Sequence, residues 1–131
     1  LESSSAASDV YKRQVIIPIS TLNKKDILFL KNKIRELILE INKNISTSQI
    51  NKWLNHVVEN NSHPRINGKE VKLKYGTQVS KNPLTIKIFS NFSKEISNSY
   101  KRYLLNNFYN FFKIKSRNLK ILFSKSKNPY D

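Results

Sequence analysis

Residues 70–92 read EVKLKYGTQVSKNPLTIKIFSNF and predict two short strands joined by the connection 79–83. In the first, about 70–79, an apolar set alternates with a charged set: Val71, Leu73 and Tyr75 against Glu70, Lys72 and Lys74. The second, about 84–92, alternates in the same way: Leu84, Ile86 and Ile88 against Thr85, Lys87 and Phe89. Such alternation is typical of strands with one buried and one solvated face. The apolar set of the first strand and the set of Leu84, Ile86 and Ile88 in the second strand are therefore expected to face a core.

The elements on either side of these strands predict what covers that core. The run 46–49, Ser-Thr-Ser-Gln, fits a capping box that begins a helix over about 47–60. A second helix is expected over about 97–113 and a last strand over about 117–124. Residues 45–131 thus have the order α-β-β-α-β. They predict an α+β module with a three-stranded sheet and two helices on one face.

The first 44 residues have a different character. Residues 1–14 show no periodicity, and we interpret them as a cloning scar or a disordered lead-in. Residues 15–20, Val-Ile-Ile-Pro-Ile-Ser, predict a short buried strand. An amphipathic helix is expected over about 26–42, with its apolar positions at Ile27, Leu30, Ile34, Leu37, Ile38 and Ile41. Because the chain contains no Met, we expect it to be a piece of a larger protein.

Composition narrows the function. The 131 residues include 24 Lys and Arg against 9 Asp and Glu, for a formal net charge of +15. Residues 45–131 hold 16 of these basic residues and 4 of the acidic ones, a net of +12, which favours a polyanionic partner. The absence of Cys excludes a disulfide scaffold and a thiol nucleophile, and with two His neither a metal site nor a His-based triad is expected. No apolar run approaches the roughly 20 residues of a membrane helix.

Several short motifs resemble one family in its own order. Residues 45–54, ISTSQINKWL, are similar to the start of the C-terminal domain of the Der family (also called EngA), bacterial double GTPases of ribosome assembly. The resemblance continues through 72–79, 82–83, 88–89 and 99–104 and ends at 127–130, Lys-Asn-Pro-Tyr. It implies that residues 45–131 are a KH-like domain that directly follows the second GTPase domain.

By the same resemblance, residues 15–44 are the end of a P-loop GTPase domain: its last strand, its guanine-contact loop and its last helix. The loop would be Ser20, Thr21 and Leu22, although Thr21 replaces the usual Ala. Residues 23–26, Asn-Lys-Lys-Asp, spell the guanine-specificity motif N-K-x-D. In a GTPase that motif follows its own strand and precedes the Ser-Ala loop, whereas here the capping box at Ser46 comes next. We therefore discount it.

The chain lacks G-x-x-x-x-G-K-[ST], because its only glycines are Gly68 and Gly76. We therefore expect no GTP hydrolysis, no catalytic residue, no metal site and no cofactor in this chain; GTP and Mg²⁺ belong to the parent family through the resemblance. A true KH fold grips nucleotides with a G-x-x-G loop. This sequence contains no G-x-x-G motif. Electrostatic docking to structured ribosomal RNA is the better hypothesis.

Candidate RNA contacts are basic residues on the polar strand faces, in loops and on the second helix: Lys72, Lys74, Lys81, Lys87, Lys101, Arg102, Lys120, Lys125 and Lys127. Lys113, Lys115 and Arg117 near the C-terminus are further phosphate contacts to consider. The alternative is that most of these are ordinary solvated positions. Aromatic residues at helical spacing are expected in the core: Trp53, Tyr100, Tyr103, Phe108, Phe111 and Phe112. Those expected to be exposed are Phe89, Phe92 and Tyr130.

Two functions remain open. The first is an RNA- and ribosome-docking module of a cytoplasmic, GTP-binding ribosome-biogenesis GTPase, with the large ribosomal subunit and its RNA as partners. The alternative is an intramolecular regulatory module that packs on the GTPase domains of the same parent chain. Binding to a membrane surface is disfavoured, because the helix at 26–42 is nearly charge-balanced.

Overall fold

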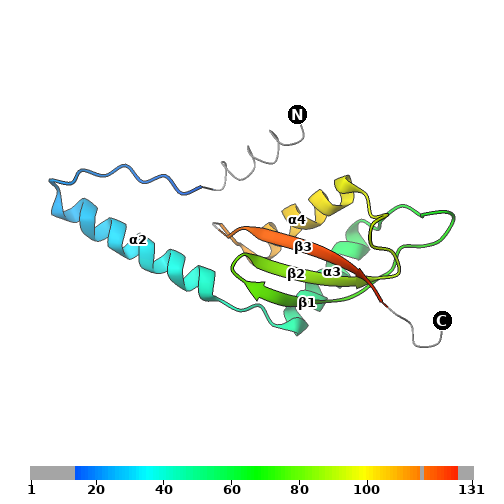
Figure 1. Ribbon diagram of the computed structural model, residues 1–131. Coiled ribbons are helices and arrows are strands. Elements are labelled where there is room, and N and C mark those ends of the chain that lie inside the picture. Colours follow the sequence, from blue (N-terminus) through cyan, green and yellow to red (C-terminus); the bar gives the residue numbers. More distant parts are fainter. Residues whose placement is uncertain (1–13, 116, 127–131) are drawn as a thin grey trace.

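A computed structural model describes residues 14–115 and 117–126. Its centre is a sheet with the strand order β1-β2-β3, formed by β1 (Leu73–Lys81), β2 (Leu84–Ser90) and β3 (Leu119–Lys125). The helices α3 (Thr47–Asn60) and α4 (Asn98–Phe112) lie together on one side of this sheet, and α2 (Lys24–Asn42) projects away from it (Figure 1). The predicted α+β order α-β-β-α-β is confirmed.

The strand directions follow from the connections. A two-residue turn joins β1 to β2, so these strands pair antiparallel. Between β2 and β3 the chain crosses over through α4, and these two strands pair parallel. Both β1 and β3 are therefore edge strands, and β2 is the central one.

Local sequence sets the ends of the two packed helices. Ser46 and Gln49 form the predicted capping box, in which the Ser46 side chain accepts from the Gln49 amide, and α3 begins at Thr47. Ser97 caps α4 in a similar way by accepting from the Tyr100 amide. Lys113 ends α4 in the left-handed region, with φ of 52°.

The core lies between the sheet and these helices. Trp53 is fully buried, its ring stands edge-on to Phe108 at 4.9 Å, and its Nε1 donates to Asn107 Oδ1 at 3.1 Å. The predicted burial of Trp53, Tyr100 and Phe108 is confirmed, while Tyr103 and Phe112 are half-buried. Other buried apolar residues are Ile45, Ile50, Leu54, Val57, Val71, Leu84, Ile86, Ile88, Ile96, Leu104 and Leu119.

One aromatic residue of α4 was placed wrongly by its spacing. Phe111 is 43% exposed, because it lies at the rim of the helix layer beside His56, with ring centroids 5.5 Å apart. Of the aromatics expected to be exposed, Phe89 and Phe92 are half-buried and Tyr130 lies outside the described residues. The residue after Phe111, Phe112, is half-buried against the core, so packing selects one of these two neighbouring rings.

A β-bulge in β1 reverses the predicted alternation. Leu73 pairs with Ser90 and Tyr75 pairs with Phe89, so Lys74 is an extra residue without a partner. One extra residue turns the side chains that follow it to the other face, here as far as Gln78, after which β1 has a second register shift. The prediction that Tyr75 faces the core is therefore wrong: Tyr75 lies on the open side of the sheet and is 47% exposed.

Gly76 takes the inward position that the pattern gave to Tyr75. A Cβ at Gly76 would lie 2.9 Å from Ile50 Cγ2, so β1 approaches α3 more closely than a side chain would allow. Asn51 closes this contact, because its Oδ1 accepts from the Gly76 amide at 2.9 Å and its Nδ2 donates to the Gly76 carbonyl at 3.3 Å. The absence of a side chain thus fixes how the sheet packs on α3.

The segment before α2 does not form the predicted strand. Residues 14–20 have no strand pairing within the part of the chain that the structure describes, because a strand needs a neighbour for its backbone hydrogen bonds. The predicted helix is confirmed, although it begins at Lys24 rather than 26. Asn23 caps it by accepting from the Lys25 amide, and Asp26 Oδ2 accepts from the Ser20 amide at 3.0 Å. Asn23 and Asp26 thus order the start of a helix.

Candidate nucleic-acid interface

The side of the sheet opposite α3 and α4 carries a distinct set of side chains, which we call the outer face. Ile86 and Ile88 are fully buried toward the helices, so the alternate residues of β2 point the other way. Register then places their cross-strand partners on the same side. We define the outer face by Tyr75, Thr77, Lys87, Phe89, Lys120 and Leu122. Ser80, Thr85 and Ser124 share this side by register, and Thr85 is buried.

An aromatic pair lies on the β1 side of the outer face. The rings of Tyr75 and Phe89 stack with centroids 4.5 Å apart and planes 17° apart. Lys87 Nζ lies 5.3 Å from the centroid of the Phe89 ring, within the range of a cation–π contact. Leu122 of β3 is exposed on the same face. Aromatic, cationic and aliphatic groups are therefore side by side on an open surface.

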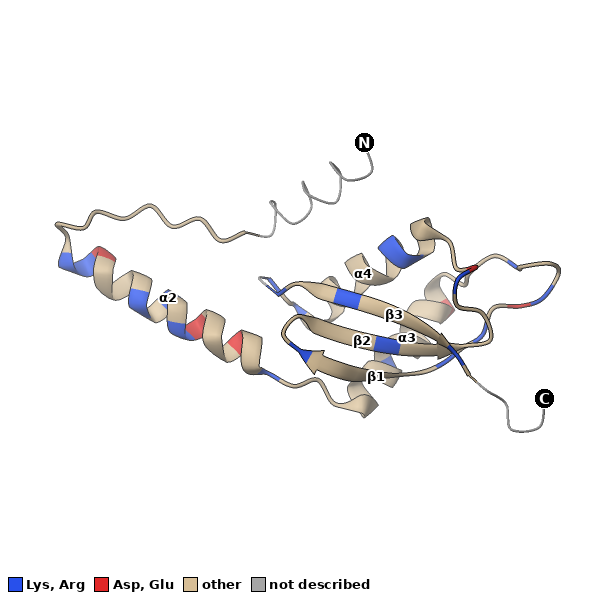
Figure 2. Ribbon diagram, in the orientation of Figure 1, with Lys and Arg blue, Asp and Glu red and all other residues tan. Residues whose placement is uncertain are grey.

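The charge of the sheet has one sign. The three strands contain five lysines and no Asp or Glu: Lys74, Lys81, Lys87, Lys120 and Lys125. Figure 2 shows blue positions and no red ones on the strands. None of the five makes an ion pair with a residue that the structure describes. Apart from Lys125, whose charge acts on the nearby Glu95 carboxyl, these lysines leave an excess of positive charge, and such an excess attracts phosphates.

The structure distributes the predicted RNA contacts unevenly. Lys87 and Lys120 lie on the outer face itself. Lys74 is the bulged residue of β1, Lys81 ends that strand, and Lys72 precedes it, all three exposed. Lys87 and Lys120 thus lie on the outer face, and the other three lie along the β1 edge of the sheet.

Three other candidates lie elsewhere. Lys101 and Arg102 are on α4 in the helix layer, where Lys101 Nζ is 5.8 Å from the centroid of the Phe123 ring. Lys125 ends β3 close to an acid: backbone hydrogen bonds from Glu95 and Ser93 lower the pKa of the Glu95 carboxyl, and the charges of Lys125 and Lys94 lower it further. Lys127 lies outside the described residues.

Arg117 is not a phosphate contact. It is 5% exposed, and its guanidinium donates to the Lys43 carbonyl at 2.8 Å and to the Lys81 carbonyl at 2.7 Å. Burial lowers the pKa of this guanidinium, partly offset by the nearby Glu40 carboxylate. Arg117 therefore ties the segment after α2 to the end of β1. The sequence carries no sign of this role, because both acceptors are backbone carbonyls far away along the chain.

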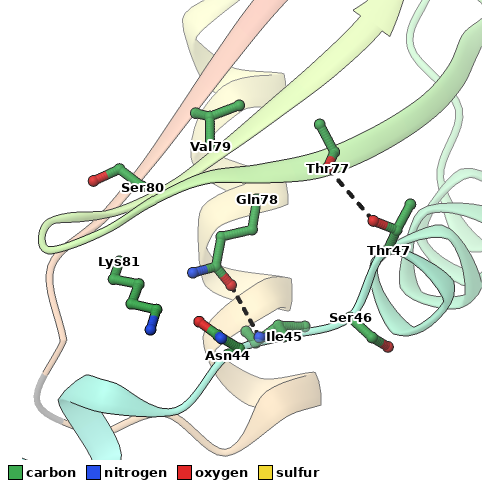
Figure 3. Close-up of a pocket in the computed structure, with 9 residues that line it drawn as sticks. All are labelled: Asn44, Ile45, Ser46, Thr47, Thr77, Gln78, Val79, Ser80 and Lys81. Atoms are coloured by element: carbon green, nitrogen blue, oxygen red, sulfur yellow. Dashed lines mark hydrogen bonds between the residues drawn. The ribbon is translucent and has the colours of Figure 1, made fainter.

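A polar groove of about 390 Å³ lies beside the β1 edge, between that strand and the residues that lead into α3 (Figure 3). Across it, Gln78 Oε1 accepts from the Ile45 amide at 2.9 Å, and the hydroxyl oxygens of Thr47 and Thr77 are 3.5 Å apart. Lys81 lines one end. The groove adds hydroxyl groups and one cation to the margin of the outer face.

The remaining predicted site is the loop before α2. Ser20, Thr21 and Leu22 are all exposed there, and Leu22 is 96% exposed. Their contact with guanine stays a prediction.

In residues 14–115 and 117–126, no group of three His, Cys, Asp or Glu is close enough to hold a metal ion. Within the same ranges, no helix has both the length and the apolar composition needed to cross a bilayer.

Two helices against a three-stranded mixed sheet, in the order α-β-β-α-β, define a KH-like module. Residues 44–124 match the family described as the KH-domain-like of EngA bacterial GTPase enzymes, C-terminal, and the chain belongs to this family. GTPase Der from Rickettsia canadensis (strain McKiel) is 38% identical over 118 residues, which cover 88% of this chain and 26% of the relative. GTPase Der from Rickettsia felis (strain ATCC VR-1525 / URRWXCal2) is 37% identical over 118 residues, which again cover 88% of this chain and 26% of the relative. The chain thus spans about a quarter of the length of these relatives.

Proposed function

We propose that this chain is the RNA-docking part of a GTP-binding ribosome-assembly GTPase and that it binds structured RNA of the large ribosomal subunit. The observation that supports the proposal is the concentration of lysines on one sheet, where the strands carry five lysines and no acidic residue. Binding of this kind is mainly electrostatic, because each phosphate that a lysine neutralises releases condensed counterions.

The proposal predicts a steep dependence on salt. If the five lysines of the outer face and the β1 edge (Lys72, Lys74, Lys81, Lys87 and Lys120) each contact one phosphate, affinity for duplex RNA regions should fall by about 500-fold between about 50 and 200 mM salt. We expect this fall in fluorescence anisotropy titrations of the 131-residue chain with large-subunit ribosomal RNA. A flat response to salt would contradict the proposal.

Two charge-matched variants locate the interface. Lys87→Gln combined with Lys120→Gln removes two charges from the outer face and should reduce the salt slope by about 2. Lys25→Gln combined with Lys31→Gln removes two charges from α2 and should leave the slope unchanged. Equal reductions of the salt slope in the two double variants would show that only total charge matters and would contradict an interface on the outer face.

A second candidate function is an intramolecular contact with the GTPase domains of the parent. It is favoured by exposed apolar side chains on the KH-like module, among them Val79, Phe111 and Leu122. If the module packs on a GTPase domain through the outer face, that domain from a matched relative should bind this chain in trans, and Leu122→Asp should abolish the heat of binding in calorimetry. Unchanged binding by the variant would exclude this face.

We further propose that the chain itself does not hydrolyse GTP. Gly68 and Gly76 are its only glycines, so the phosphate-binding loop of a GTPase has no counterpart in this sequence. GTP and Mg²⁺ would then bind to other domains of the parent. Release of phosphate from GTP by the purified chain, above the rate without protein, would contradict this.

A further inference from the structure

Phosphate docking explains the lysines of the outer face but not its exposed aromatic ring. We propose that the outer face binds a single-stranded RNA segment and that an unpaired base stacks on Tyr75. This inference rests on the proposed RNA-docking function and specifies which form of RNA the sheet takes. It requires an accessible ring, cations at a suitable distance and a reason to prefer RNA over protein.

The ring of Tyr75 is accessible because of the strand that carries it. The bulge at Lys74 turns Tyr75 toward the side of the sheet opposite α3 and α4, which neither helix covers (Figure 1). Phe89 stacks on Tyr75 with a centroid distance of 4.5 Å and holds the ring in place, yet Tyr75 remains 47% exposed. A ring that is already oriented loses little conformational entropy when a base stacks on it.

The cations lie on a diagonal across the sheet. Tyr75 pairs with Phe89, Lys87 is two residues further along β2, and Lys120 of β3 pairs with Thr85, two residues further again. With strands about 4.8 Å apart and a rise of about 3.3 Å per residue, the Cα atoms of Lys87 and Lys120 lie roughly 8 and 16 Å from that of Tyr75. An RNA strand that crosses the sheet diagonally from β1 to β3 can therefore place a base on Tyr75 and phosphates near Lys87 and Lys120.

The charge of the face favours RNA over a protein partner. Covering the outer face with an apolar protein surface would remove water from Lys87 and Lys120, for which the described strands offer no carboxylate. A single RNA strand supplies phosphates for the lysines and a flat base for the ring. Duplex RNA supplies only the phosphates, because its bases are already stacked and paired.

The test compares two RNA probes on the 131-residue chain. One is a single-stranded RNA of about 12 nucleotides with a central 2-aminopurine, and the other is the same sequence in a duplex. Tyr75→Ala should weaken binding of the single strand by about 5- to 100-fold, leave duplex binding within about twofold, and abolish the quenching of 2-aminopurine fluorescence. Tyr75→Phe keeps the ring and should behave like the unmodified chain.

Phe111→Ala is the matched control. Phe111 is 43% exposed, close to the 47% of Tyr75, but it lies on the helix layer. The variant Phe111→Ala should leave the affinity for the single-stranded RNA unchanged. Circular dichroism should show that both alanine variants fold; if Tyr75→Ala does not, Tyr75→Leu replaces it, and the same selective loss is expected.

The outcomes separate this inference from the proposed function. Unchanged single-strand binding by Tyr75→Ala, or an equal loss for single strand and duplex, would overturn base stacking while RNA docking stands. Loss of binding to a GTPase domain in Tyr75→Ala, with RNA binding intact, would assign the outer face to a protein and overturn the inference too. Failure of the unmodified chain to bind either RNA would overturn both proposals.

Discussion

The helix α2 and the helices of the KH-like module have similar sequence patterns but different surroundings. In α2, apolar residues recur at helical spacing as regularly as in α3 and α4, yet no residue of α2 is buried. In α3, by contrast, Ile50, Trp53, Leu54 and Val57 are all buried. The difference is the partner: α3 and α4 pack against the sheet, whereas α2 projects away from it (Figure 1).

The described contacts between α2 and the module lie at the C-terminal end of the helix. Glu40 Oε1 accepts from the Lys115 amide at 2.9 Å, and Arg117 donates to the carbonyl of Lys43 just after the helix. An amphipathic pattern thus indicates that a helix has a face suited to burial, whereas only the tertiary packing shows what covers that face.

The largest predicted effect compares the same substitution in the two regions. Leu104 of α4 is fully buried, and Leu104→Ala should lower the free energy of unfolding by about 2–5 kcal/mol through lost burial and a cavity. Leu39 of α2 is 73% exposed, and Leu39→Ala should change it by less than about 0.5 kcal/mol. Urea unfolding followed by circular dichroism measures both. Equal costs would show that α2 is packed as tightly as the module.

The next effect concerns the close contact of β1 with α3, which has no counterpart in α2. In Gly76→Ala the new Cβ would lie 2.9 Å from Ile50 Cγ2, so this packed contact must open at a cost of about 1–3 kcal/mol. The control is Thr77→Ala, which removes only a hydroxyl 3.5 Å from that of Thr47 on α3 and inserts no atom into the packed contact. It should cost less in the same urea titration. A Gly76→Ala variant as stable as the parent would show that the sheet is free to shift on the helix.

A third prediction concerns the connection between the two regions. Arg117→Met removes both hydrogen bonds to the Lys43 and Lys81 carbonyls and should cost about 1–3 kcal/mol. Arg117→Lys should recover only part of this, because an ammonium lacks the planar fork of a guanidinium. Hydrogen exchange at the Lys115 amide, which donates to Glu40, should become faster.

Arg102→Met on the exposed side of α4 is the matched control and should change neither stability nor exchange. If Arg117→Met leaves the exchange of the Lys115 amide unchanged, then Arg117 does not connect α2 to the module.

The smallest effect appears at alkaline pH. Burial, together with the neighbouring Tyr103, raises the pKa of Tyr100 to about 12. An unfolded tyrosine ionises near pH 10, so the folded state holds this proton to higher pH and its contribution to stability, complete below about pH 10, is lost as pH rises toward 12. Ultraviolet absorbance of the phenolate should show a late step that Tyr100→Phe removes. The same late step in Tyr100→Phe would contradict the assignment.

Much of the module was predictable because local chemistry sets it. The capping box of Ser46 and Gln49 predicts the start of α3, and the alternation of Leu84, Ile86 and Ile88 predicts the buried face of β2. The motifs of residues 45–54 and 72–79 also led to the correct family. Each of these signals lies within a few consecutive residues.

The errors arose where distant residues decide. The strand predicted at 15–20 has no neighbouring strand among the described residues. The buried Arg117 donates hydrogen bonds to two backbone carbonyls that lie 74 and 36 residues away along the chain. Neither fact is visible in a local pattern, because a hydrogen-bond partner of this kind is supplied by the fold.

The sequence by itself determined the α+β order, the helix caps, the basic charge and the family. Tertiary structure alone decided which way Tyr75 points. Period-two alternation assigns it to the core, but the bulge at Lys74 and the contact of Gly76 with Ile50 turn it to the outer face. The physical reason is that strand register is a property of two strands and the helix beneath them, so one inserted residue moves an aromatic ring from the core to the surface.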